Sequence, residues 1–290
     1  MKKEDIYIKL VISLIIFLII GFFIKGNIQS SLINTILIVS SFIFGIMVAF
    51  SIANRHSRFN SIREKLREQD ALLLNLYLLS KSFTKETSKK IKIAIDKYLI
   101  SQLDYELKDF TTLSSKTLKK LFFEVESIKP KNKKQESVYS EGLSILKDLL
   151  KTYDEVSYQI KNKMTMIEWI SLITLSLTIL FSLYSLNSGA IIYVVILAVL
   201  STSLVLLLLI LRGLDTLSWQ EQFWIWEPLT DLFNELDLIP YYPIPIIKEK
   251  RINKKTLLKY NKIRIAYYPN KYPNMKGKKI KIIDPKKEKF

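Results

Sequence analysis

The 290-residue chain contains no cysteine and a single histidine, His56, and it has only 7 glycines and 8 prolines. Without cysteine there is no disulfide bond, no thiol nucleophile and no iron–sulfur cluster, and one histidine cannot complete a usual zinc site. A Ser-His-Asp triad would have to use His56 itself. The scarcity of glycine and proline argues against a loop-rich or disordered chain. We therefore expect no enzymatic activity, no metal ion and no cofactor.

Charged residues are missing from three long stretches, at residues 10–24, 26–54 and 169–211. A membrane-spanning helix needs about 20 apolar residues, so the third stretch holds two spans. Its turn falls at Leu186-Asn187-Ser188-Gly189, because asparagine, serine and glycine favour chain reversal. The first two stretches meet at Lys25-Gly26-Asn27. We predict four transmembrane helices in two hairpins, at residues 6–24, 31–53, 167–186 and 190–211.

The basic residues predict the orientation of these spans. Residues 53–163 hold 23 Lys and Arg and residues 212–290 hold 17, whereas the two turns hold only Lys25. Lys and Arg remain on the cytoplasmic side of a membrane. We therefore expect a multi-pass protein of the cell (inner) membrane with both termini in the cytoplasm. No small-residue cleavage site follows the first apolar run, so we expect this run to be a retained anchor.

The segment between the second and third spans has the apolar periodicity of helices. Residues 54–80 form its first helix, Thr84 caps the next, and Lys129-Pro130 precedes a last helix that begins near Ser137. No helix breaker separates this segment from the adjacent spans, so the second and third spans should continue into it as long helices. The predicted fold class is all-α, with a helical cytoplasmic block between the second and third spans.

Beyond the fourth span, Trp219, Trp224 and Trp226 indicate a position at the membrane surface. The last residues of the chain are rich in lysine. The chain is thus expected to have five parts: a transmembrane hairpin at 1–53, a cytoplasmic helical domain at 54–166, a second transmembrane hairpin at 167–211, an interfacial or cytoplasmic helical segment at 212–247, and a polybasic tail at 248–290.

Small residues recur at four-residue spacing on the second span, at Ser41, Gly45, Ala49 and Ala53. Such a stripe lets another helix backbone approach closely. It is either a packing seam of an oligomer or pore, or an ordinary contact with the first or fourth span.

Bulky apolar residues lie beside this stripe, at Phe42, Ile46 and Phe50. If this face points at a central axis, it forms an apolar pore neck that closes by dewetting; otherwise these side chains face lipid. No ionisable residue lies at the centre of any predicted span. That absence disfavours a proton-coupled transporter and a cation pore lined by carboxylates.

Two basic groups are candidates for anion contacts. Arg55, His56 and Arg58 follow the second span, and the tail contributes Lys276, Lys278 and Lys279. Either group can draw small anions to a pore mouth or bind anionic lipid head groups. Because the chain is held in a lipid bilayer, nucleic acid is the less favoured partner.

Two segments resemble the bestrophin-like membrane proteins, in particular their bacterial and archaeal branch. One reads RFNSIREKLREQDALLLNLYLL at residues 58–79, and its charged residues among leucines resemble the family's first cytoplasmic helix. The other reads NELDLIPYYP at residues 234–243, although the family's usual Pro-Phe-x-Gly ending is absent. The topology of residues 30–245 is similar as well.

Bestrophins are pentameric chloride channels with an apolar neck on the second span. The resemblance therefore implies a homo-oligomer, chloride or another small anion as the permeant ion, and a neck at Phe42, Ile46 and Phe50. The acidic calcium-binding cluster of animal bestrophins has no evident match, because Asp215, Glu221 and Glu227 are scattered.

We thus expect an oligomeric anion channel in the membrane. The alternative is a non-conducting membrane scaffold that binds a partner or anionic lipid through its cytoplasmic helices and basic tail. A third class, an enzyme acting on lipid, has no nucleophile and base pair to support it.

Protease added outside intact cells should leave residues 54–163 and 212–290 uncut, because both segments are expected to be cytoplasmic. Peptide mapping after the treatment is the measurement, and lysed cells provide the control in which both segments are cut. Cleavage near Lys131 in intact cells would contradict the four-span orientation.

Overall fold

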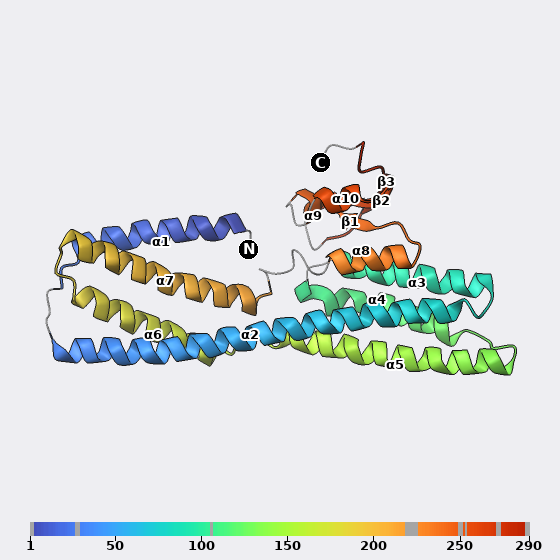
Figure 1. The fold of residues 1–290 in the computed structure, drawn as a ribbon, viewed down its shortest axis with the longest axis horizontal. Helices are drawn as coiled ribbons and strands as arrows, with labels where there is room; N and C mark the ends of the chain where they lie inside the picture. Colours follow the sequence, from blue (N-terminus) through green and yellow to red (C-terminus); the bar gives the residue numbers. More distant parts are fainter. Residues whose placement is uncertain are drawn as a thin grey trace. The chain divides into compact units, whose positions relative to one another are not determined.

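The computed structural model describes residues 3–26, 30–104, 107–217, 226–248, 252, 254–270 and 274–287. The chain divides into two compact units. Unit 1 comprises Met1–Phe59 and Asn162–Trp219, and unit 2 comprises Asn60–Lys161 and Gln220–Phe290. Most of the chain is helical (Figure 1), which confirms the predicted class. Four helices are long and apolar enough to cross a membrane, as the uncharged stretches predicted.

Unit 1 contains the helices with the predicted spans. They are α1 (Lys3–Phe23), the first part of α2 (Ser31–Ser80), α6 (Met166–Ser185) and α7 (Ile191–Asp215). Helix α1 packs along α7 (Figure 1). A buried cluster joins α2 to α6 and α7 through Phe44, Val48, Leu172, Ile179 and Leu211. The arrangement of the spans as two hairpins remains a prediction.

Asn187, in the predicted turn after α6, is fully buried and fixes the end of α1. Its side-chain amide donates hydrogen bonds to the carbonyls of Gly21 (2.7 Å) and Ile24 (2.6 Å). Carbonyls in the last turn of a helix have no partner within the helix, so Asn187 supplies one. Its own side-chain oxygen accepts a hydrogen bond from the N–H of Gly189 at 3.0 Å. Gly189 has a φ of +79°, a left-handed backbone conformation that glycine adopts readily. The side chain of Asn187 therefore provides hydrogen-bond partners for backbone groups both at the end of α1 and in its own turn.

The prediction that both inner spans continue as long helices is right for one of them and wrong for the other. Helix α2 is continuous over 50 residues, from Ser31 to Ser80. By contrast, α5 (Lys133–Lys161) ends before α6 begins at Met166. Thr165 caps α6 through a capping box, in which its hydroxyl accepts the N–H of Glu168 and the Glu168 carboxylate accepts the N–H of Thr165. The Thr-x-x-Glu pattern before an apolar run was visible in the sequence and marks a helix start.

Unit 2 packs the rest of α2 against α3 (Lys85–Leu103), η1 (Leu107–Asp109), α4 (Phe110–Glu126) and α5. Thr84 caps α3, as predicted, by accepting the N–H of Thr87 at 3.2 Å. The core consists of apolar side chains from all four α-helices, including Ile62, Leu73, Leu99, Leu121 and Leu149.

The remainder of unit 2 contains a small sheet that the sequence analysis did not predict. After α8 (Trp226–Glu235) come β1 (Tyr241–Pro243), α9 (Ile244–Lys248), α10 (Lys254–Leu258), β2 (Ile263–Tyr267) and β3 (Lys279–Ile283). The strand order is β1-β2-β3, with β1 parallel and β3 antiparallel to β2. Isoleucines alternate along β2 and β3, but the surrounding lysines hid this strand pattern. Trp219, Glu221 and Trp224 lie outside the described residues.

Asn187→Ala should lower the stability of unit 1 by about 1–3 kcal/mol, because two helix-end carbonyls lose their donor. Ser188→Ala, at the exposed neighbouring position, is the matched control and should have little effect. Thermal unfolding of the purified protein in detergent measures both. Equal melting temperatures for the two variants would show that the Asn187 contacts contribute nothing to stability.

Candidate pore-lining and anion-contact sites

The three residues predicted to form a pore neck, called the neck residues below, lie on the exposed side of α2. Phe42, Ile46 and Phe50 follow one another at four-residue intervals, and their side chains are 69%, 42% and 73% exposed. Residues two positions apart on a helix point about 200° away from each other. Phe44 and Val48 therefore face the opposite way, into the core of unit 1. The neck residues are exposed because Phe44 and Val48, on the opposite side of the same helix, pack into the core of unit 1.

The small-residue stripe is also uncovered. Ser41, Gly45, Ala49 and Ala53 are all exposed. A Cβ placed on Gly45 would meet no atom within 4 Å, so no other described helix of the chain packs closely there. The stripe and the neck residues share a side of α2 that the rest of unit 1 leaves open to lipid or to another copy.

Arg55 and Arg58 lie further along α2, on the side that packs into unit 1, and both are buried. A side-chain nitrogen of Arg55 (Nη1) lies 3.5 Å from Oδ1 of Asp215 and donates a 2.7 Å hydrogen bond to the carbonyl of Asn162. Arg58 donates to the backbone carbonyl of Asp215 at 2.9 Å, and its guanidinium lies 3.9 Å from the Asp215 carboxylate. The same carboxylate accepts the N–H of Met164 at 2.8 Å. This Asp215 network connects α2, the segment before α6 and the end of α7.

The sequence analysis missed the role of Asp215, which it had grouped with two scattered acidic residues. One signal could have revealed it. Asp215 follows the fourth span and the two arginines follow the second, so the positive-inside argument places all three at the same side of the membrane. Buried charges of opposite sign at one depth are expected to pair. The proposed contact of Arg55 and Arg58 with anions or lipid stays a prediction.

The remaining predicted contact residues differ in their surroundings. His56 is exposed, and its ring stacks near that of Phe59 with centroids 6.2 Å apart. Lys278 forms an ion pair with Asp104 at 2.5 Å, whereas Lys276 and Lys279 are exposed. Within the described part of the chain, no three His, Asp or Glu side chains cluster as metal ligands would.

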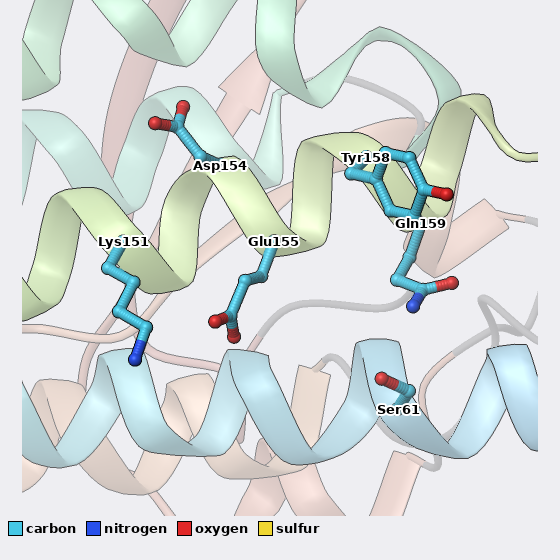
Figure 2. Close-up of a pocket in the computed structure, with 6 residues that line it drawn as sticks. All are labelled: Ser61, Lys151, Asp154, Glu155, Tyr158 and Gln159. Carbon is cyan, nitrogen blue, oxygen red and sulfur yellow. The ribbon is translucent and has the colours of Figure 1, made fainter.

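A groove of about 560 Å³, lined by residues of polar type, lies between α2 and α5 in unit 2 (Figure 2). Its lining residues are Ser61, Lys151, Asp154, Glu155, Tyr158 and Gln159. Figure 2 shows Glu155 and Lys151 extending from α5 toward α2, whereas Asp154 points the other way. Lys65 pairs with Glu155 at 2.8 Å, and this hydrogen-bonded contact holds the pKa of Glu155 below its usual value. No lining residue is a histidine or cysteine, so Ser61 lacks the partner that usually activates a serine nucleophile.

Asp215→Asn should destabilise unit 1 by about 3–5 kcal/mol, because it removes the carboxylate that two buried guanidinium groups share. The double variant Arg55→Gln with Asp215→Asn should recover part of that loss, since one buried charge is then gone. Asp231→Asn, which makes the same change at an exposed position, is the control. Thermal unfolding in detergent gives the order of stability, and a harmless Asp215→Asn would rule out the network as a structural constraint.

The comparison with protein families identifies the chain. The family model for the bestrophin-like domain matches residues 8–216. No curated protein and no solved structure is significantly similar to the chain. The matched range covers well over half of the 290 residues and reaches from the first candidate span to the fourth. The chain therefore belongs to the bestrophin-like family of membrane proteins.

Proposed function

We propose that copies of the chain assemble into a ring in the cell membrane and conduct small anions such as chloride through its centre. The exposed side of α2 lines the pore, and Phe42, Ile46 and Phe50 form its neck. The observation that carries this proposal is the exposure of these three bulky apolar residues on a helix whose opposite side is fixed in the core of unit 1. The family resemblance suggests five copies.

The chemistry of the neck suits a gate that needs no charged residue. Water withdraws from a narrow apolar constriction because the walls offer it no hydrogen bonds, and ions cannot pass without water. A small widening or a hydroxyl group restores hydration. The formal net charge of +17 favours anions over cations in the surrounding solution. The small-residue stripe beside the neck permits a close approach between neighbouring copies.

The second candidate function is a non-conducting scaffold. The observation that favours it is the exposure of Lys276 and Lys279 on the folded tail, where they are available to a partner or to anionic lipid. The scaffold needs no central pore. The number of copies in the purified protein separates the two, because a closed ring is required for conduction and a monomer cannot provide it.

Phe50→Ala and, separately, Ile46→Ser should raise chloride flux into liposomes by at least about tenfold, which corresponds to lowering the barrier by about 1.4 kcal/mol. Each change makes the neck wider or more polar. A fluorescent chloride indicator inside the liposomes provides the measurement, with the unmodified chain and protein-free liposomes as references.

Phe181→Ala is the matched control for this experiment. Phe181 lies on α6 and is 70% exposed, so the same side chain is removed from an exposed position that is not on α2. Its flux should equal that of the unmodified chain. If the two neck variants stay folded and oligomeric but leave flux at the protein-free level, the channel proposal is wrong and the scaffold takes its place.

A further inference from the structure

The strand β3 ends the sheet of unit 2 and leaves one edge open. Within the described residues, β3 pairs with β2 on one side and with no other strand. An edge strand presents backbone N–H and C=O groups that can pair with a further strand. Four of its five residues, Lys279 to Ile282, are exposed.

The two sides of β3 have different chemistry. The register with β2 places Ile280 and Ile282 on the side of Ala266 and Arg264, and it places Lys281 on the opposite side with Ile265. Ile280 and Ile282 are 45% and 59% exposed, which is high for isoleucine in a sheet.

On the opposite side, the Lys281 ammonium lies 5.5 Å from the ring centre of Tyr267, a cation–π distance. Lys279 is the direct cross-strand neighbour of Tyr267. The edge therefore carries Ile280 and Ile282 on one side, and Lys279 and Lys281 together with Ile283 on the other.

We propose that the open edge of β3 binds an extended segment of another protein in which acidic and apolar residues alternate. Such a segment adds a fourth strand to the sheet, with main-chain hydrogen bonds for affinity and alternate side chains for specificity. Its apolar residues cover Ile280 and Ile282, and its carboxylates lie beside Lys279 and Lys281. Opposite charges on neighbouring strands stabilise the pairing.

A second copy of β3 fits this edge less well than an acidic strand does. Lys279 and Lys281 lie on the same side of β3, so antiparallel pairing of two copies centred on residue 280 or 281 would bring lysines next to lysines. Like charges on neighbouring strands destabilise the pair. Lysines on an edge strand are also a common protection against self-association. The charge pattern thus disfavours a second copy of β3 in these registers and favours a strand with acidic residues.

A bilayer surface fits the edge less well than a strand does. The isoleucines and the lysines point to opposite sides of the sheet, so a flat lipid surface cannot contact both groups at once. A strand lying along the edge contacts both. The pattern of β3 therefore favours a peptide over anionic lipid.

The test uses the full-length protein in detergent and a fluorescent, capped peptide of about six residues, a usual strand length, in which glutamate alternates with valine. Fluorescence anisotropy should report saturable binding, and hydrogen exchange at the β3 amides should slow when the peptide is bound. A peptide of the same composition with glutamates and valines in separate blocks should bind at least about tenfold more weakly, because its side chains cannot match both sides of the edge.

A charge reversal provides the decisive variant. Lys279→Glu with Lys281→Glu should weaken binding of the glutamate–valine peptide at least about tenfold and create binding of a lysine–valine peptide. Lys119→Glu with Lys120→Glu changes two exposed lysines of α4 and gives the same net charge, so its binding should be unchanged. If the variant Lys279→Glu with Lys281→Glu fails to fold, Lys279→Gln with Lys281→Gln takes its place. It should weaken binding of the glutamate–valine peptide without creating affinity for the lysine–valine peptide.

Three results would overturn the proposal. One is equal binding of the alternating and block peptides, which would mean simple charge attraction. Another is unchanged peptide binding after charge reversal at Lys279 and Lys281. The third is a site on β3 that anionic lipid vesicles occupy and the alternating peptide does not, because the lysines would then serve a membrane surface.

Discussion

The carboxylate of Asp215 holds together three segments of unit 1 that are far apart in the sequence. It accepts the N–H of Met164 and lies opposite Arg55, while the backbone carbonyl of Asp215 accepts Arg58. Buried charges are stable only when they are paired and hydrogen-bonded. Turning α2 by one residue, about 100°, would separate both arginines from Asp215 and expose Phe44. The side that α2 presents to its surroundings therefore depends on this one acidic residue.

Apolarity cannot select the packed side of α2 by itself. Phe42 and Phe44 have the same side chain and lie two residues apart, yet one is exposed and the other is buried. Lipid tails are as apolar as a protein core, so burial in either gives a similar free energy. The polar contacts of Arg55 and Arg58 with Asp215, at the end of the second span, decide which side of α2 is packed. They leave the neck residues and the small-residue stripe together on the open side, which is the condition that a pore built from several copies requires.

Local patterns in the sequence predicted the local features of the fold. Uncharged stretches gave the four spans, and Thr84 gave the start of α3, because each depends on neighbouring residues alone. The break before α6 was also encoded locally, by Thr165 and Glu168, and was overlooked in favour of helical periodicity. The Asp215 network and the three-stranded sheet depend on residues far apart in the chain. A single sequence contains no direct signal for such pairings, so the candidate site could be predicted as residues on α2 but not as a packed arrangement.

The lysines of the tail are alike in the sequence but have different surroundings in the structure. Its lysines all indicated contact with a polyanion. In the structure, Lys278 pairs with Asp104, which also accepts the hydroxyls of Tyr241 and Tyr268. Lys281 lies over an aromatic ring, and Lys279 remains exposed on the same side of β3. A charge already neutralised by a neighbouring carboxylate attracts a further anion weakly. The number of lysines therefore overstates the positive field of the tail, and the positions of the exposed ones on a strand edge decide which partners they can meet.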